Sequence, residues 1–117
     1  MHELAVCQAL LAQVEDIARE NDARVVSRIA VSIGPLSGVE APLLLRAFTI
    51  ARAGTIAEAA TLELEAMTIR VRCKSCGCES DVSANRLTCR ACGDWKTDLL
   101  SGDELVLRQV EMENDHV

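Results

Sequence analysis

Five of the six cysteines lie close together past the middle of the chain, and four of them form two CxxC pairs. Cys73 and Cys76 form the first pair, and Cys89 and Cys92 form the second after an interval of twelve residues. Two sulfurs at this short spacing can reach one ion from a single loop, so two such loops supply a tetrahedral set of four thiolates. The spacing therefore predicts a closed, structural zinc site.

A glycine follows the second cysteine of each pair, at Gly77 and Gly93. Glycine takes a positive φ without steric cost, which lets the neighbouring backbone amides turn toward the sulfurs. The two remaining cysteines, Cys7 and Cys78, fall outside the pattern, and we expect them to be free thiols. Disulfides are rare in reducing compartments, so metal binding is the favoured interpretation of the cluster.

A second group of candidate ligands lies at the first residues, Met1 and His2. An α-amine, an imidazole and the backbone amides between them are nitrogen donors within a few bonds of one another. Nickel(II) favours square-planar nitrogen ligation, which such a group can supply. Because the bulky His2 disfavours removal of the first methionine, we expect the amine to be that of Met1. The start of the sequence is therefore a candidate nickel site.

The composition narrows the classes of function. The chain has 117 residues, a net charge of -6 at pH 7 and a pI of about 4.8. This charge repels phosphate backbones, and one Trp, one Phe and no Tyr leave few rings for base stacking, so we expect no nucleic-acid partner. No apolar stretch approaches the roughly 20 residues of a transmembrane helix, and the start is not the basic segment of a signal peptide. We therefore expect a cytoplasmic protein without a membrane partner.

Hydrophobic periodicity predicts two helices that hold these groups in place. Apolar residues recur at three- and four-residue steps between Glu3 and Glu20. The face that this helix is expected to bury carries Leu4, Cys7, Leu11, Val14 and Ala18. A second helix is expected to begin at a capping box formed by Ser37 and Glu40 and to stop at Gly54.

Alternation of apolar and polar residues predicts three strands, over residues 25–33, 61–72 and 104–113. The parity of the second strand changes near Ala66, which predicts a bulge or bend there. Two helices can cover one face of a small three-stranded sheet. We therefore expect an α+β fold of this kind, with an inserted four-cysteine module that resembles a zinc ribbon.

The inserted module differs from the rest of the chain in charge. Residues 70–96 hold six basic residues against three acidic ones, in a chain of net charge -6. Four thiolates and Zn²⁺ together carry a charge of about -2, so we interpret the basic residues as compensation for the site. The predicted organisation is a nickel-binding domain formed by residues 1–69 and 99–117, and a zinc-binding domain over residues 70–98.

Several segments, in order along essentially the whole chain, resemble the HypA/HybF family of hydrogenase maturation proteins. They are the start Met-His-Glu-Leu, residues 34–40 (GPLSGVE), residues 54–58 (GTIAE), the two CxxC pairs and residues 101–105 (SGDEL). The combination of a Met-His-Glu start with internal CxxC pairs is specific. The sequence departs from the family pattern at Ala5, in the first helical turn, and over residues 46–49, which bears on the partner surface.

The resemblance implies a nickel metallochaperone that delivers Ni(II) during maturation of NiFe hydrogenase and, in some organisms, of urease. Nickel would be held by the Met1 amine, the His2 imidazole and the backbone amides of His2 and Glu3, and zinc by the four paired cysteines. The implied partners are a HypB-type GTPase, the NiFe hydrogenase large subunit and, in some organisms, urease maturation proteins. Glu40 lies where some family members place an acidic group near nickel. Monomer and homodimer both remain open.

Other functions remain open on the residues alone. A zinc ribbon that binds nucleic acid would explain the CxxC pairs and the nearby basic residues, but not the acidic chain or the scarcity of aromatic residues. A zinc-stabilised adaptor that binds only proteins would not need a free N-terminus. An enzyme is not expected, because neither His2 nor His116 lies beside a plausible nucleophile and the sequence has no P-loop or dinucleotide motif.

Overall fold

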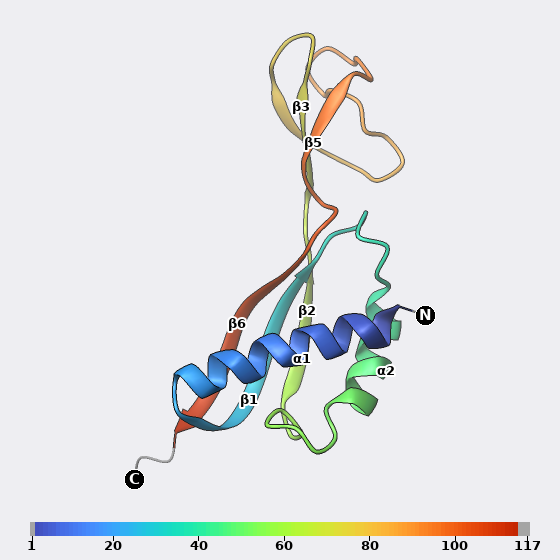
Figure 1. The fold of residues 1–117 in the computed structure, drawn as a ribbon. Helices are drawn as coiled ribbons and strands as arrows, with labels where there is room; N and C mark the ends of the chain where they lie inside the picture. Colours follow the sequence, from blue (N-terminus) through green and yellow to red (C-terminus); the bar gives the residue numbers. More distant parts are fainter. Residues whose placement is uncertain (1, 115–117) are drawn as a thin grey trace. The chain divides into compact units, whose positions relative to one another are not determined.

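The computed structural model describes residues 2–114, and Figure 1 traces their path. The elements follow one another in the order α1 (Glu3–Glu20), β1 (Ala23–Ile33), α2 (Ala41–Ala51), β2 (Thr61–Ala66), β3 (Ile69–Cys73), β4 (Glu79–Val82), β5 (Thr97–Ser101) and β6 (Leu105–Asn114). Two helices and two small sheets confirm the expected α+β class. Neither helix in the described part of the chain is long and apolar enough to cross a membrane.

The chain forms two compact units, each built from several segments. The first, here called the helical unit, comprises the residues up to 32, residues 39–65 and the residues from 106 onward. The second, here called the cysteine unit, comprises residues 33–38 and 66–105. The chain therefore passes from one unit to the other four times. The division by metal, with zinc bound over residues 70–98, stays a prediction, because compactness does not test metal binding.

A three-stranded sheet with the order β2-β1-β6 lies at the centre of the helical unit. Figure 1 shows β1 and β2 running in the same direction, with α2 connecting them. β6 runs opposite to β1: Ser27 Oγ donates to the Glu111 carbonyl at 3.2 Å, and Arg108 Nε donates to Ser32 Oγ at 2.8 Å. The last strand of the chain therefore completes the sheet that the first strand began.

The buried face of α1 follows the predicted periodicity except at its first turn. The buried residues of this helix are Glu3, Cys7, Leu10, Leu11, Val14 and Ala18. Leu4 is 41% exposed, so the prediction that it belongs to the buried face is wrong. Successive helical residues are rotated by about 100°, and position 3, not position 4, lies in line with Cys7 and Val14. A polar residue therefore occupies the first buried position of the helix.

The start of α2 also differs from the prediction. Glu40 is its N-cap residue, with extended backbone (φ -96°, ψ 124°), and Pro42 lies in the first turn. The capping box predicted from Ser37 is wrong, because that motif requires the glutamate at the third helical position and not at the cap. Proline suits the first turn, since its fixed φ is helical and it lacks an N–H that would have no partner there. The helix ends at Ala51, three residues before the predicted Gly54.

The cysteine unit has its own sheet, in which β3 lies between β4 and β5 and is antiparallel to both. Side chains alternate along β3, which buries Ile69, Val71 and Cys73. The expectation of one strand over residues 61–72 is wrong, because β2 and β3 belong to different sheets. The change of parity near Ala66, where a bulge or bend was expected, coincides with the end of β2 at Ala66, and β3 begins at Ile69.

Two glycines allow distant backbone segments of the cysteine unit to meet. The Gly34 amide donates to the Glu104 carbonyl and the Leu36 amide donates to the Gly102 carbonyl, each at 2.8 Å. A Cβ on Gly34 would lie 2.3 Å from the Gly102 carbonyl oxygen, which is far closer than van der Waals contact. Residues 33–38 therefore fold with the residues that follow β5, although the whole cysteine region separates them in the sequence.

Candidate metal centres

The four cysteines of the CxxC pairs come together in the cysteine unit. Their Sγ atoms all lie within 4.8 Å of one another. The Sγ atoms of Cys73 and Cys92 are 3.5 Å apart, and those of Cys76 and Cys89 are 3.6 Å apart. A tetrahedral zinc ion with Zn–S bonds of about 2.3 Å separates its sulfurs by about 3.8 Å. The donor set and its spacing therefore fit a zinc ion whose coordination the protein completes.

Backbone amides turn toward the first sulfur of each pair. The amides of Ser75 and Cys76 donate to Cys73 Sγ at 3.3 and 3.4 Å. The amide of Ala91 donates to Cys89 Sγ at 3.3 Å. Such contacts stabilise the thiolate form of a ligand and fix its direction. The loops therefore hold the first sulfur of each pair with its hydrogen-bond partners already in place.

The glycines that follow each pair have the conformation predicted for them. Gly77 has a φ of +77° and Gly93 has a φ of +79°. Their amides close each loop, since Gly77 donates to the Cys73 carbonyl at 3.0 Å and Gly93 donates to the Cys89 carbonyl at 2.8 Å. The similar geometry of the two loops explains how both pairs can direct their sulfurs to one point.

Backbone amides make the first thiol of each pair more acidic. The amide of Cys76 is the main cause of a lowered Cys73 pKa, and the amide of Cys92 lowers the pKa of Cys89 to about 7. The pKa of Cys76 rises to about 12, because the lowering effect of the Cys78 amide is outweighed by the neighbouring Cys89 thiol and by burial. Thiolates at contact distance repel one another. A divalent cation among the four sulfurs would remove that repulsion and favour all four thiolates.

The two other cysteines lie outside this cluster, as expected. Cys78 is exposed and does not belong to the four-sulfur group. Cys7 is fully buried on α1, and its thiol donates to the Leu44 carbonyl at 3.4 Å. Burial raises the pKa of Cys7 to about 11, so this thiol stays protonated at neutral pH. Cys7 therefore contributes to packing between α1 and α2.

His2 lies at the start of α1, where it is the N-cap residue. Its carbonyl accepts the Val6 amide at 2.9 Å, and its side chain is 55% exposed. The first amides of a helix have no partner within the helix. An exposed imidazole thus stands at the first helical turn, where the Glu3 amide interacts with the Glu3 carboxylate and not with a helical carbonyl. Met1 lies outside the described residues, so the structure does not place the expected amine ligand.

The side chain of Glu3 is a feature that sequence reasoning missed, since only its backbone amide was considered. The side chain is buried, and its Oε2 accepts the Glu40 amide at 3.5 Å. Its own backbone amide is the main cause of a lowered Glu3 pKa, and the Glu40 amide also lowers it. The spacing of four residues from Cys7 could have indicated this burial, because both lie on the same face of α1. Glu3 therefore ties the start of α1 to the start of α2.

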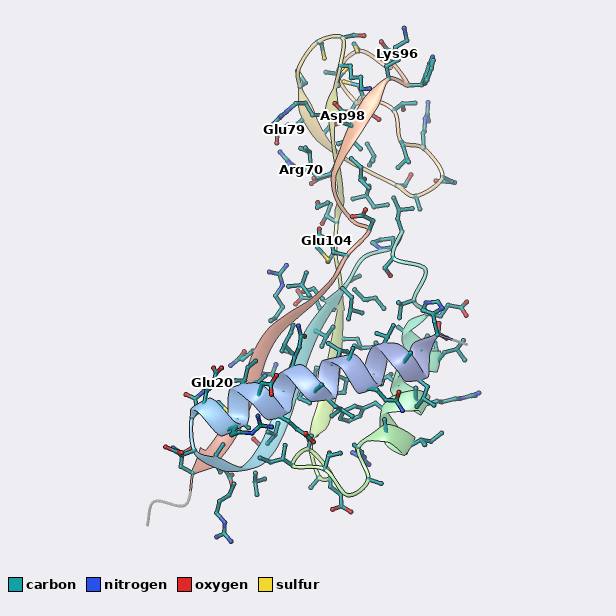
Figure 2. The ribbon with its side chains drawn as sticks, in the orientation of Figure 1. Glu20, Arg70, Glu79, Lys96, Asp98 and Glu104 are labelled. Atoms are coloured by element: carbon teal, nitrogen blue, oxygen red, sulfur yellow. The ribbon has the colours of Figure 1, made fainter. Side chains whose placement is uncertain are left out.

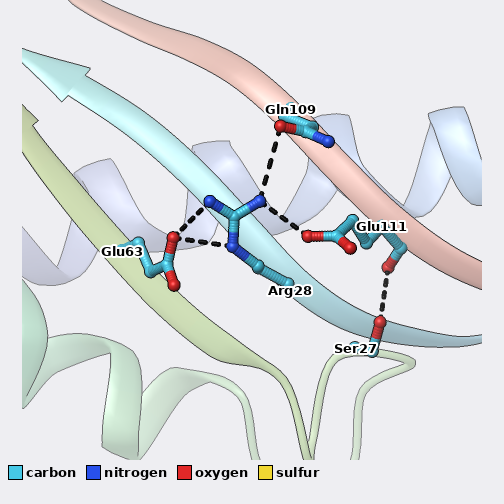
Figure 3. Close-up of polar contacts among 5 residues, drawn as sticks. All are labelled: Ser27, Arg28, Glu63, Gln109 and Glu111. Carbon is cyan, nitrogen blue, oxygen red and sulfur yellow. Dashed lines mark hydrogen bonds and ion pairs between the residues drawn. The ribbon is translucent and has the colours of Figure 1, made fainter.

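A polar cluster on the sheet of the helical unit, drawn in Figure 3, is structural and not a metal site. Arg28 on β1 pairs with Glu63 on β2 through Nε at 2.6 Å, and with Glu111 on β6 through Nη1 at 2.6 Å. Figure 3 shows Arg28 on the side of the sheet away from α1. The hydrogen bond with Arg28 lowers the pKa of Glu63. One arginine thus joins all three strands.

Comparison with known proteins agrees with this arrangement. A family model described as hydrogenase/urease nickel incorporation, metallochaperone, HypA matches residues 1–112. The hydrogenase maturation factor HypA of Nitrosospira multiformis is 50% identical over 112 residues, which are 96% of this chain and 97% of the relative. The factor of the same name from Aquifex aeolicus is 43% identical over 115 residues, which are 98% of this chain and 100% of the relative.

Solved structures extend the likeness to the fold. The solution structure of the nickel metallochaperone HypA from Helicobacter pylori superimposes with a TM-score of 0.76 at 26% sequence identity. It covers 98% of this chain and 100% of that chain. The sequence match, the fold and the four-cysteine cluster lead to one conclusion: the chain belongs to the HypA family of nickel metallochaperones, which act in hydrogenase maturation.

Proposed function

We propose that this chain carries one Ni²⁺ as cargo at its N-terminus, through the Met1 amine, the His2 imidazole and the backbone amides of His2 and Glu3. The observation that carries the proposal is the position of His2 at the start of α1, where its imidazole is exposed beside the first-turn amides. These are the nitrogen donors that square-planar Ni(II) prefers. An exposed terminal site also suits a protein that must release its metal to another.

The buried Glu3 carboxylate holds the residues beside this site in place. By accepting the Glu40 amide, it holds the first turn of α1 against the N-cap of α2. The imidazole Nε2 of His2 lies 3.9 Å from the same carboxylate oxygen of Glu3. Packing thus fixes the direction in which the chain enters the helix. The exposed Glu40 carboxylate is a separate candidate that a Glu40→Gln variant tests.

We assign the four clustered sulfurs to a structural Zn²⁺, with Cys73, Cys76, Cys89 and Cys92 as its ligands. When bound, zinc supplies a rigid crosslink between the two loops. Four thiolates leave no open coordination position for water or a substrate, so the site has no hydrolytic role. This agrees with relatives named as maturation factors. We therefore propose a carrier protein and not an enzyme.

The test is a nickel titration by calorimetry near neutral pH on protein that begins at Met1 and retains zinc. We expect one tight site in the unchanged chain and its loss in His2→Ala. The matched control is His116→Ala, which removes the only other histidine and should leave nickel binding unchanged. Equal nickel binding in His2→Ala and the unchanged chain would overturn the ligand set.

A second preparation separates the amine from the imidazole. An N-terminally acetylated form keeps the His2 imidazole but turns the Met1 amine into an amide. A free amine is a far better nickel ligand than an acetylated one, so we expect nickel affinity to fall at least about tenfold. Unchanged affinity would show that the Met1 amine is not a ligand, even if His2 is.

The partners that we propose are a HypB-type GTPase and the NiFe hydrogenase large subunit, with urease maturation proteins as further recipients in some organisms. We place this exchange in the cytoplasm. Transfer is tested by incubating nickel-loaded protein with each purified partner and measuring the nickel that remains after separation. Loss of nickel to the GTPase or to the large subunit supports the assignment, and retention in the presence of both contradicts it.

A further inference from the structure

We propose that the segment between β4 and β5 binds an acidic peptide segment of a partner protein, in a cavity beside the cysteine cluster. The cavity has a volume of about 700 Å³, and the metal-binding loop lines it at Cys89 and Gly93. The charged residues of its lining are Arg86, Arg90 and Asp81, and Asp81 is already paired with Arg70. Sites of this size accommodate a few side chains of a bound molecule. The inference rests on the proposed zinc site, because one metal-binding loop forms part of the cavity wall.

The charges around the cavity are the first argument. Three basic residues of the cysteine unit already have carboxylate partners, and Figure 2 labels three residues of these pairs, Arg70, Glu79 and Asp98. The pairs are Arg70 with Asp81 at 2.7 Å, Arg72 with Glu79 at 2.8 Å and Lys74 with Asp98 at 3.4 Å. Within residues 2–114, neither Arg86 nor Arg90 forms an ion pair. Two guanidinium groups at one cavity therefore remain available to an external anion.

The backbone that carries these arginines is fixed at several points. Thr97 Oγ1 donates to the Leu87 carbonyl at 2.8 Å, which joins the segment to β5. The Arg90 amide donates to Ser80 Oγ at 3.4 Å, which joins it to β4. Next to Arg90, the Cys89 amide donates to the Asp94 carbonyl at 2.9 Å, which closes the metal-binding loop. A preformed loop reduces the ordering entropy that binding would otherwise cost.

The chemistry of the arginines and their neighbours favours an acidic peptide as the occupant. A guanidinium group binds a carboxylate through two parallel hydrogen bonds, which gives direction as well as charge. Leu87, between the two arginines in sequence, is 37% exposed, and Trp95 is 74% exposed. Large exposed apolar side chains in the same segment as unpaired cations match a peptide that combines glutamate or aspartate with apolar residues.

A nucleic acid fits these observations less well. Backbone phosphates recur at short intervals and require a row of cations, whereas the cavity offers two. The chain as a whole carries a charge of -6, which opposes the approach of a polyanion of high charge density. A short peptide with a few carboxylates is repelled less and can still engage both arginines.

The test uses the full zinc-loaded chain and a fluorescein-labelled tetraglutamate peptide with blocked ends. We expect saturable binding by fluorescence anisotropy that weakens as salt is raised. The double variant Arg86→Gln/Arg90→Gln should lose at least about tenfold in affinity. The control variant Arg19→Gln/Arg46→Gln removes the same charge from exposed positions of the helical unit and should bind as the unchanged chain does.

Further arms decide between explanations. Arg86→Lys/Arg90→Lys keeps the charge and should recover part of the binding, which a merely structural role of the arginines would not produce. Equal peptide binding in the glutamine double variant and the unchanged chain would overturn the proposal. Tighter binding of a single-stranded oligonucleotide than of the peptide would also overturn it.

Zinc and nickel contents, measured on each variant, keep this inference separate from the proposed function. The glutamine double variant should retain one zinc and bind nickel as the unchanged chain does, because neither arginine is a ligand. A variant with full metal binding and no peptide binding would confirm the cavity as a distinct site. Peptide binding that persists after a chelator removes zinc would show that binding does not need the metal-binding loop in the cavity wall.

Discussion

The two units hold their candidate metal ligands by different means. In the helical unit, α1 and α2 pack on a sheet, and fully buried aliphatic residues such as Val14, Ile29 and Leu44 form the core. This packing fixes the helix α1 at whose start His2 lies. The cysteine unit buries few aliphatic side chains, among them Ile69 and Val71, and two of its other buried residues are the candidate ligands Cys73 and Cys89.

This difference indicates how each site behaves without its metal. The helical unit keeps its fold through packing, so His2 should hold its place at the start of α1 whether or not nickel is bound. The cysteine unit is too small to build much core, so its order should depend on the ion. A nickel site that keeps its structure when empty can be loaded again after it has released its metal.

Zinc removal should have the largest effect on stability, and it should unfold the cysteine unit while the helical unit stays folded. Binding of a structural zinc can contribute more free energy than the whole stability of a small domain. After chelation, we expect amides of β3, β4 and β5 to lose protection from hydrogen exchange, while amides of α1 and β1 retain it. Mass spectrometry of exchange on the full chain measures both. Equal loss of protection in the two units would contradict the comparison.

A cavity in the core of the helical unit should destabilise that unit and leave the cysteine unit intact. Leu44→Ala removes a fully buried side chain from α2, and we expect a loss of about 2–5 kcal/mol in the free energy of unfolding. Its neighbour Leu43 is 38% exposed, so Leu43→Ala is the matched control and should cost far less. Denaturant unfolding measures the change. Zinc content should stay at one ion per chain in both variants, and a loss of zinc in Leu44→Ala would show that the units depend on each other.

Gly34→Ala should destabilise the cysteine unit by a smaller amount. The added Cβ would meet the Gly102 carbonyl, and such overpacking typically costs about 1–3 kcal/mol. Gly38→Ala is the control: no atom lies within 4 Å of its Cβ position, so only its φ of +78° opposes the change. Zinc affinity in competition with a chelator should weaken more in Gly34→Ala. A greater weakening in Gly38→Ala would show that this contact is not important.

The smallest effect should come from the arginine cluster on the sheet. Because Arg28 lowers the pKa of Glu63, this carboxylate contributes stability above its usual pKa of about 4.5 and loses it as pH falls through the lower value of the folded state. Glu63→Gln should therefore reduce stability slightly at pH 7 and make no difference in strong acid. The control is Glu65→Gln on the same strand. Thermal unfolding between pH 7 and strong acid should show that the midpoint temperature depends less on pH in Glu63→Gln than in Glu65→Gln or the unchanged chain.

Features set by local sequence were predictable. The bounds of α1, the CxxC pairs and the positive φ of Gly77 and Gly93 follow from periodicity, ligand spacing and the freedom of glycine. Each of these depends on residues within a few positions of one another. The candidate zinc ligands could therefore be identified from their spacing along the chain alone.

Features set by contacts between distant residues were not predictable. Arg28 meets partners 35 and 83 positions away, and no local pattern indicates such pairs. The burial of Glu3 is different, because its spacing from Cys7 indicates the buried face of α1, but only apolar residues were counted on that face. Strands β4 and β5 are short and half exposed, so alternation in them is weak. The membership of residues 33–38 in the cysteine unit depends on tertiary contacts alone.

The connection of the units also has a consequence for synthesis of the protein. The ribosome makes the chain from its N-terminus, so every cysteine of the cluster is made before β6, the strand that completes the sheet of the helical unit. Until β6 emerges, β1 has an open edge, and the pairing that closes this edge joins residues far apart in the sequence, which is slow. Zinc capture can therefore precede completion of the helical unit, so the cysteine unit can become ordered while one edge of β1 is still unpaired.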